Sequence, residues 1–199
     1  MIDTKRHEHL KIKICISGSA EMSNLPPRVH ESAKIIGAAI ANRGGITMTG
    51  ATTGYPFWAA MGAKEAGGIS IGLSPAETER EHVEGYKLPI DFMDVIIYTG
   101  FGYPGRDLFL VRSSDAVITG PGRIGTFHEF MVAYEDGKPM GVLESDDWDT
   151  DDILKEILAK SNRPADHIIF DKDPERLVER IFEMVKKQKV NDTYKKKIY

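Results

Sequence analysis

The chain has 199 residues, of which 41% are hydrophobic, a net charge of −4 and a pI near 5.9. This length fits a single domain with a substantial core, so we expect one domain over residues 1–199, with flexible tails at 1–10 and 188–199. The acidic balance argues against a nucleic-acid backbone or a membrane surface as the main partner, because both require a basic face.

The cysteine content predicts a reducing compartment. Cys15 is the single cysteine and lies in an apolar run, so no disulfide can form within the chain, and we expect a cytoplasmic protein. No stretch approaches the roughly 20 apolar residues that cross a bilayer. The N-terminal residues are polar and lack the apolar core of a signal peptide. We assign His7 and His9 to the N-terminal tail and expect no metal site there.

Short apolar runs alternate with longer amphipathic stretches along the whole chain. We expect strands over 11–16, 46–49, 69–73, 95–99, 116–119, 140–143 and 167–170. We expect helices over 26–42, 54–66, 106–114, 126–135 and 174–187, and one more that ends near 160. The alternation predicts an α/β fold with three layers, Rossmann-like, in which a mostly parallel sheet carries helices on both faces.

In such sheets, ligands bind where strands end and loops lead into helices. Three loops at these places are rich in glycine and hydroxyl side chains, which suits phosphate binding. The predicted phosphate- or nucleotide-binding residues are Ser17, Gly18, Ser19, Gly50, Thr53, Gly54, Gly122, Arg123, Ile124, Gly125 and Thr126.

The loop over 120–126 carries the strongest signal, because it follows a predicted strand and opens a helix. Unpaired N–H groups at a helix start attract an anion. The same segment also reads as a capping box, with Thr126 at the N-cap and Glu129 three residues later. Glu129 therefore either caps its helix or faces the ligand. His128 is a candidate surface, interface or catalytic residue.

Arg106 ends a glycine-rich loop over 99–106 and is suited to pairing with phosphate or carboxylate. The alternative is a solvated arginine at a helix start. Arg112 is the lesser candidate, for a surface or subunit contact. The charged segment 74–89 predicts a solvated face, although His82 and Tyr86 are candidates to line a pocket.

The sequence contains no zinc-binding pattern, no Ser-His-Asp order and no P-loop lysine. Lys64 and Lys138 are the interior lysines that pyridoxal chemistry would need, and neither lies in a recognisable pocket. We therefore expect neither a metal nor a cofactor.

The run from Ser114 to Glu129 resembles the P-G-G-x-G-T-x-x-E signature of the Lonely Guy (LOG) family. Arg106 falls where the family carries the arginine of an R-K or R-N pair. The loop that begins at Ser17 resembles the family's G-S-S loop, and Thr49 to Gly54 resembles its G-G-G-x-x-G loop. The resemblance extends from about 11 to 187, with its specific part between 106 and 129.

The resemblance implies a nucleoside 5′-monophosphate phosphoribohydrolase, which releases a free base and ribose 5-phosphate, as from a cytokinin riboside monophosphate. Arg106 and Glu129 would be the catalytic residues. The label of lysine decarboxylase that such proteins have often carried is not supported. Related branches include the molybdenum cofactor carrier proteins, so the alternative is a non-catalytic carrier of a nucleotide or a phosphorylated cofactor.

Three departures from the family pattern bear on this choice. Arg123 replaces the second glycine of P-G-G, Ala51 replaces a loop glycine, and Asp107 replaces the lysine or asparagine beside the arginine. Arg123 adds charge beside the proposed phosphate, so it either strengthens binding or fills the pocket. Arg123 and Ala51 favour the carrier alternative.

Two partner hypotheses remain. A single-strand DNA binder on a related fold is disfavoured by the acidic balance and the lack of a basic, aromatic groove. A homodimer or larger even assembly is implied by the resemblance. Three aromatic residues on one predicted helix, Phe127, Phe130 and Tyr134, add a weaker indication, with core packing as the alternative.

Overall fold

The computed structural model describes residues 10–191, and within them seven parallel strands form one sheet in the order β4-β3-β2-β1-β5-β6-β7. The strands are β1 (Lys13–Ser17), β2 (Ile46–Thr49), β3 (Ile69–Ser74), β4 (Val95–Tyr98), β5 (Ala116–Thr119), β6 (Met140–Leu143) and β7 (Ile168–Asp171). The helices are α1 (Arg28–Asn42), α2 (Tyr55–Glu65), α3 (Gly102–Ser113), α4 (Ile124–Glu135), α5 (Thr150–Ser161) and α6 (Pro174–Asn191), with a π-helical turn η2 (Glu81–Gly85).

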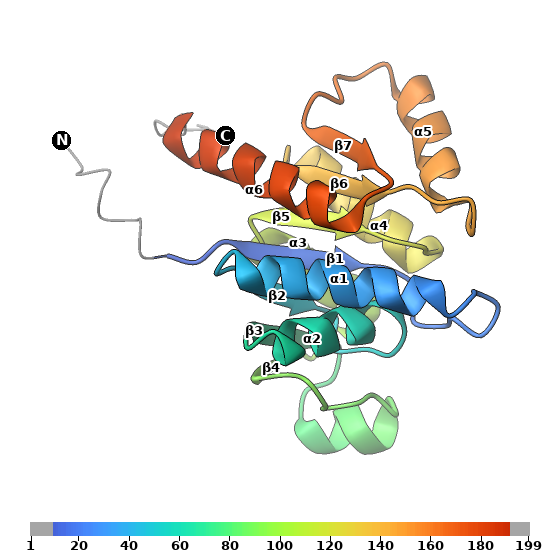
Figure 1. Cartoon of the computed structure of the whole chain (residues 1–199). Helices are drawn as coiled ribbons and strands as arrows, with labels where there is room; N and C mark the ends of the chain where they lie inside the picture. The colour runs from blue at the N-terminus through green and yellow to red at the C-terminus, as the bar shows by residue number, and fades with distance from the viewer. Residues whose placement is uncertain (1–9, 192–199) are drawn as a thin grey trace, which may run out of the picture.

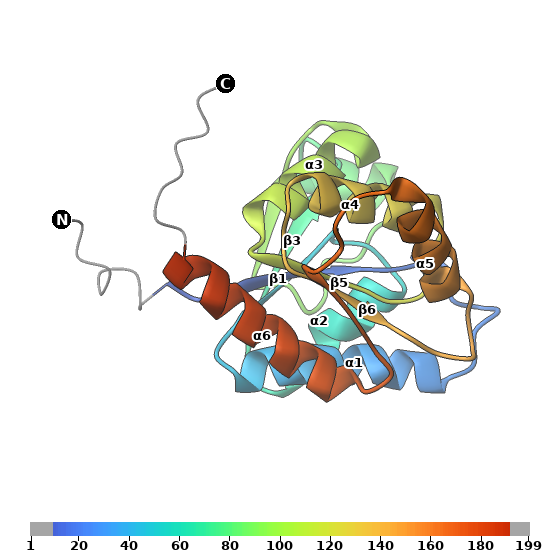
Figure 2. The same cartoon turned by 90° about the horizontal axis from the view of Figure 1, so that it is seen from above.

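The sheet lies between two layers of helices, which confirms the predicted fold class. Helices α1, α2 and α6 cover one face, and α3, α4 and α5 cover the other (Figures 1 and 2). Successive side chains of β1 point to opposite faces, so Ile14 and Ile16 pack in the core under α1 and α6, whereas Cys15 packs in the core under α3 and α4. Because both faces of each central strand are buried, the strands read as continuous apolar runs.

Strand β1 sits at the centre of the sheet and pairs in parallel with both β2 and β5. From β1 the chain first builds the sheet toward β4 and then crosses over to add β5, β6 and β7 on the other side. Loops leaving β1 and β5 therefore diverge and open a crevice at the carboxyl ends of these two strands, which is where such sheets bind ligands.

Several predicted boundaries are shifted, and two of the shifts lie beside the cavity. Helix α3 begins at Gly102 rather than at 106, because the first turn of a helix needs no intrahelical N–H donors and so tolerates Pro104 within it. Helix α4 begins at Ile124, two residues before the predicted start. Both early starts lie in glycine-rich segments that composition alone predicts to be loops.

The C-terminal tail predicted from 188 is helical as far as Asn191, in continuation of α6. The apolar residues of α6 follow helical spacing, and Lys189 in its last turn complements the helix dipole. The predicted tail residues 1–9, with His7 and His9, and 192–199 lie outside the described residues. Among residues 10–191, no helix has the length and apolar character to cross a membrane.

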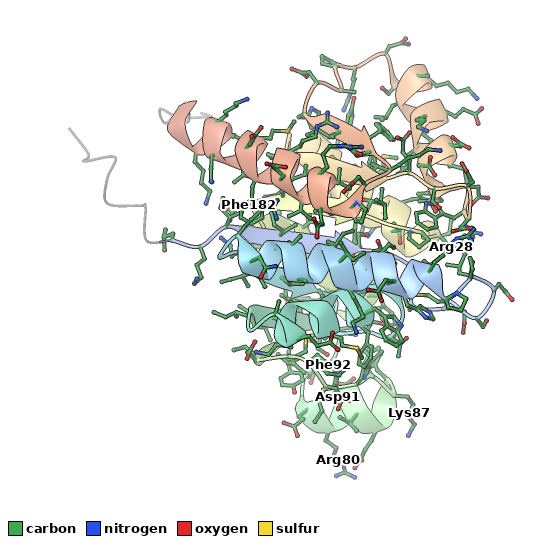
Figure 3. The ribbon with its side chains drawn as sticks, in the orientation of Figure 1. Arg28, Arg80, Lys87, Asp91, Phe92 and Phe182 are labelled. Atoms are coloured by element: carbon green, nitrogen blue, oxygen red, sulfur yellow. The ribbon has the colours of Figure 1, made fainter. Side chains whose placement is uncertain are left out.

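The segment between β3 and β4 carries the charged face that the sequence predicts. Arg80 and Lys87 project outward from it in Figure 3, and Arg80 Nε lies 2.7 Å from Glu84 Oε2 with both side chains exposed. His82 is fully buried, with Nδ1 2.8 Å from Ser74 Oγ and Nε2 3.0 Å from the Pro89 carbonyl oxygen. It is therefore a hydrogen-bonded core histidine, and its assignment to a pocket is wrong.

Candidate functional site

A cavity of about 270 Å³ lies at the carboxyl ends of the central strands, toward which the arrows of Figure 1 point. Its walls come from the loops after β1, β2 and β5 and from the first two turns of α3 and α4. The lining residues are Ile16, Gly18, Ser19, Ala20, Gly50, Thr52, Pro56, Tyr103, Arg106, Asp107, Arg123, Gly125, Thr126 and Glu129. Eight of the predicted site residues are among them, from all three predicted loops.

Backbone hydrogen bonds hold the three loops together. Ser19 N–H donates to the Pro121 carbonyl at 2.6 Å, which joins the loop after β1 to the loop after β5. Tyr55 N–H donates to the Ser19 carbonyl at 2.8 Å, which joins α2 to the same loop. The cavity is therefore framed by backbone that these hydrogen bonds hold in place.

The start of α4 offers backbone N–H donors to the cavity. Ile124, Gly125 and Thr126 are its first three residues, and the first bond closing the helix is Phe127 N–H to the Arg123 carbonyl at 2.9 Å. The preceding N–H groups have no carbonyl within the helix to bind. With the helix dipole, Gly125 and Thr126 at the cavity wall form a terminus whose geometry suits an anion.

Gly122 has a different place from the one predicted. Its N–H donates to Thr150 Oγ1 at 2.8 Å, so it binds the start of α5 and does not line the cavity. A Cβ at this position would lie 2.1 Å from Thr126 Oγ1. Gly122 is therefore required so that the loop can pass close to the first turn of α4.

Arg106 lies in the second turn of α3, and only 6% of it is exposed. Its guanidinium donates from Nη1 to the Gly50 carbonyl, and a Cβ on Gly50 would lie 1.5 Å from that nitrogen. Its Cζ lies 5.6 Å from the centre of the Tyr103 ring. The alternative of a solvated arginine is wrong, because the guanidinium is buried at the cavity wall and donates a hydrogen bond to the loop after β2.

Glu129 is 8% exposed, and its Oε2 accepts a hydrogen bond from the Ser17 hydroxyl. Burial raises the pKa of Glu129 to about 7; the Asp107 carboxylate adds to the rise, whereas Arg106 and the Ser17 hydroxyl oppose it. The capping-box alternative is wrong, because α4 starts at Ile124 with no side-chain cap and Glu129 lies in its second turn. Its side chain faces the cavity.

Asp107 belongs to the site, although the sequence marked it only as a departure from a family pattern. It is 5% exposed, with Oδ1 2.9 Å from Arg106 Nε and Oδ2 2.9 Å from His128 Nδ1. The side chain of His128 is 42% exposed and lies at the outer end of this chain of contacts. The only sequence signal for Asp107 is its place next to Arg106.

Four other predicted residues lie outside the cavity lining, and one of them, Ser17, contacts Glu129 through its hydroxyl. The Thr53 hydroxyl donates to the Ala20 carbonyl at 3.0 Å, and Thr52 takes its place at the wall. Gly54 lies against the loop after β1, and Ile124 is 80% exposed. Tyr103, like Asp107, was missed because its direction depends on where α3 begins.

Two of the departures from the family pattern have clear structural consequences. Arg123 lines the cavity, and its Nη1 lies 2.8 Å from Asp149 Oδ1, so the added charge is paired at the rim and does not fill the pocket. Ala51 is fully buried with a φ of 49°, a left-handed conformation that glycine adopts with less strain.

The remaining candidates contribute to packing or surface. Arg112 pairs with Asp136 at the surface, with 3.2 Å between Nε and Oδ2. Phe130 is fully buried, and Phe127 and Tyr134 pack against the same core, so core packing replaces the interface assignment. Among the described residues, no group of three His, Cys, Asp or Glu side chains is placed to hold a metal.

Solved structures of molybdenum cofactor proteins share this fold. The molybdenum cofactor binding protein from the phototrophic bacterium Rippkaea orientalis is 29% identical, with a TM-score of 0.74 over 89% of this chain and 99% of that one. The molybdenum cofactor carrier protein from Chlamydomonas reinhardtii is 25% identical, with a TM-score of 0.71 over the same shares. These similarities support the predicted relationship to the LOG and carrier branches.

A curated relative and a family model extend the comparison. An uncharacterized protein of Archaeoglobus fulgidus is 32% identical over 109 residues, which are 55% of this chain and 66%, just under two thirds, of that protein. The model of the SLOG cluster4 family matches residues 11–178. With most of its length matched by that model, the chain belongs to the SLOG cluster4 family.

Proposed function

We propose that the protein is a binding or carrier protein for a small phosphorylated molecule with a planar ring system, of the pterin-cofactor or nucleotide class. The observation that carries this proposal is the anion-binding start of α4 beside the buried guanidinium of Arg106. Backbone N–H groups bind phosphate oxygens in such a terminus, and an arginine adds a full charge in a fixed geometry.

The cavity also offers a surface for the ring. Tyr103 lines the cavity and is partly exposed, and its own ring is braced edge-on by Tyr86, with 5.5 Å between centroids. Aromatic side chains stack on the faces of planar rings. The volume of about 270 Å³ is at the small end for ligand sites, so we expect the phosphate inside and the ring at the rim.

The similarity to proteins that bind or carry the molybdenum cofactor supports the carrier class. Such a ligand has the anionic end that the start of α4 suits. We expect this chain to contact the organic part and the phosphate, with Gly125 and Thr126 on the phosphate and Tyr103 on the ring system.

Hydrolysis of the N-glycosidic bond of a nucleoside 5′-monophosphate is the second candidate. One observation favours it: Glu129 and Arg106 are both buried and both face the cavity. The bond breaks through an oxocarbenium-like transition state, which an ionised Glu129 would stabilise while Arg106 holds the substrate. Water would then add to the anomeric carbon and the base would leave with a proton.

One experiment separates the two candidates. Melting curves and free-base detection are recorded with a panel of nucleoside monophosphates and a pterin phosphate. A carrier is stabilised by a ligand and releases no base, whereas a hydrolase releases base. Arg106→Met should abolish stabilisation by the ligand, and Arg163→Met, at an exposed pair with Glu135, is the matched control. If no phosphorylated ligand stabilises the wild type, the proposed function is wrong.

We also propose that the protein forms an even homo-oligomer in the cytoplasm. The exposed apolar residues that support self-association lie on β4, at the N-cap of α3 and on α3, and they are Val95, Ile97, Phe101, Leu108 and Phe109. The rings of Phe101 and Phe109 lie 5.4 Å apart, so they form one continuous apolar surface. The buried free thiol of Cys15 fits a reducing compartment.

A further inference from the structure

Two arginines line the cavity, and their charges are held in different ways. The Arg106 side chain is 7% exposed, donates from Nη1 to the Gly50 carbonyl and has Nε 2.9 Å from Asp107 Oδ1. The Arg123 side chain is 69% exposed, and its partner Asp149 is 62% exposed. An ion pair between exposed side chains contributes little to stability, so Arg123 can exchange Asp149 for another anion at small cost.

The guanidinium of Arg123 also has hydrogen-bond donors to spare. Its Nη1 lies 2.8 Å from Asp149 Oδ1 and 3.1 Å from the Gly122 carbonyl oxygen. Both of its hydrogen bonds to the described part of the chain come from this one nitrogen. A guanidinium is a planar fork of N–H donors, so the edge formed by Nε and Nη2 remains for an anion that accepts two parallel bonds, such as a phosphate.

The backbone of Arg123 fixes the point from which this side chain leaves. Arg123 is the N-cap residue of α4, and its carbonyl accepts the Phe127 N–H at 2.9 Å, which closes the first turn. Gly125 and Thr126, just beyond it, present their N–H groups to the cavity wall. Because the guanidinium lies further out, at the exposed rim, the helix start and the guanidinium are placed to bind two neighbouring anionic groups rather than the same one.

Tyr103 and Arg123 reach the cavity from opposite halves of the sheet. Tyr103 packs edge-on against Tyr86, from the segment between β3 and β4. Arg123 pairs with Asp149, from the segment between β6 and α5. Strands β3 and β4 lie on one side of the central strand β1, and β6 lies on the other. A ligand whose ring stacks on Tyr103 and whose first phosphate binds at the start of α4 therefore extends toward Arg123.

The charges of the cavity wall give Arg123 a purpose for such a ligand. Arg106 is in contact with Asp107, so part of its positive charge is already balanced. The carboxyl group of Glu129 also lines the cavity. A second phosphate adds negative charge beside these carboxyl groups, and of the lining residues Arg123 is the cation that remains to offset it.

We propose that the ligand carries two linked phosphates, the first bound at the start of α4 and the second by the guanidinium of Arg123, which releases Asp149 to bind it. Arg123 is thus the residue that selects a diphosphate over a monophosphate, with the ring of the ligand on Tyr103. This inference rests on the proposed function and deepens it, because it names the class of ligand. No covalent bond forms or breaks, since one ion pair of Arg123 is exchanged for another.

The first test compares adenosine 5′-diphosphate with adenosine 5′-monophosphate by calorimetry at about pH 8, where the phosphates are fully ionised, without divalent cations. We expect the wild type to bind the diphosphate about tenfold or more tightly than the monophosphate. Arg123→Met should lower the affinity for the diphosphate by about tenfold or more, and that for the monophosphate by less than about threefold. Inorganic diphosphate and phosphate repeat the comparison without a ring, so a protein that rejects adenine still reports on Arg123.

Arg28→Met is the matched control for this test. Arg28 begins α1 and is labelled in Figure 3, and its partner Asp147 lies two residues before Asp149. Arg28 is as exposed as Arg123 but does not line the cavity, so its loss should change both affinities by less than about twofold. Equal binding of the two kinds of probe by the wild type, or an equal loss of both in Arg123→Met, overturns the inference and leaves the proposed function standing. If the wild type binds none of the four probes, the proposed function fails and this inference with it.

The second test changes the partner that Arg123 releases. Asp149→Asn removes the carboxylate that competes for the guanidinium, and asparagine suits the N-cap of α5, which Asp149 occupies, so the fold should be retained. We expect the affinity for the diphosphate to rise by about two- to fivefold, and to rise less when Asp149→Asn is combined with Arg123→Met. A rise of the same size in both backgrounds shows that Asp149 only repels the ligand, and that result, or no rise at all, overturns the exchange.

Discussion

Ser17 at the end of β1 donates its hydroxyl hydrogen to the carboxyl group of Glu129 in α4, 112 residues further along the chain. This bond joins the central strand to the helix at which we propose that an anion binds. It shows that Glu129 is directed at the cavity rather than at the backbone of its own helix. Ser17 therefore holds the Glu129 side chain at the cavity wall.

Replacing Glu129 by glutamine separates binding from turnover. The amide keeps the size of the side chain and its acceptor for the Ser17 hydroxyl, so we expect phosphate binding at the start of α4 to change by less than about threefold. If the wild type releases base, that rate should fall by about 100-fold or more, because a preorganised charge is lost. Ligand binding and base release are measured on the same preparation. Equal turnover in the two proteins would exclude a catalytic role for Glu129.

The raised pKa of Glu129 predicts how stability depends on pH. Between its unfolded value near 4.5 and its folded value of about 7, the folded state holds an extra proton. The stabilisation that this proton gives the folded state is thus fully present below pH 4.5 and is lost as the pH rises through 7. The free energy of unfolding falls by at most about 3 kcal/mol over this range. The difference in unfolding free energy between wild type and Glu129→Gln, measured by denaturant titration, should fall over this range. A difference that stays flat from pH 4.5 to 8 would contradict the burial argument.

Replacing Gly125 or Gly122 by alanine should change the stability of the protein in opposite directions. A Cβ at Gly125 meets no atom within 4 Å, and alanine is favoured over glycine in a helix, so Gly125→Ala should stabilise by up to about 1 kcal/mol. The added methyl group occupies the cavity wall, so ligand binding should weaken. Gly122→Ala would collide with Thr126 and should lower the melting temperature. Gly125→Ala with normal ligand affinity would argue against phosphate binding at this turn.

Asp171 is a structural carboxylate far from the proposed chemistry. It accepts from Arg176 Nε at 2.8 Å and from Arg180 Nη1 at 3.0 Å, and these bonds, led by Arg176, hold its pKa well below the usual range. The stabilisation that ionised Asp171 gives the folded state is present above about pH 4 and is lost as the pH falls further. We expect Asp171→Asn to cost about 1–3 kcal/mol at pH 7 and much less near pH 2, by urea unfolding. A cost that does not depend on pH would show that packing, not charge, stabilises this end of α6.

The apolar surface on β4 and α3 predicts where subunits meet. Phe101→Ser together with Phe109→Ser should convert an even oligomer into a monomer in light scattering at micromolar concentration, because both changes replace exposed apolar rings by polar side chains. Phe127→Leu, at a position packed against the core, should leave the assembly unchanged. A wild type that is already monomeric would contradict the proposed self-association.

The sequence by itself determined the layers of this protein and the edge at which its site lies. Continuous apolar runs such as the one around Cys15 belong to strands buried on both faces, and helices between them force parallel pairing. Parallel strands end at one edge, so the loops at Ser17, Gly50 and Gly125 had to meet there. These conclusions depend only on periodicity and on the order of elements.

Only the tertiary structure decided which side chains face the cavity. The directions of the Tyr103 and Asp107 side chains depend on where α3 starts. Its first turn contains glycine and proline, which in a sequence predict a loop rather than a helix. Gly122 binds Thr150, a residue on another helix, and so does not line the cavity. The ionisation of Glu129 depends on the carboxyl of Asp107 and on burial, neither of which is local in sequence. Electrostatics and hydrogen bonding act through space at distances of a few ångströms, so residues far apart in the chain set the chemistry of the site.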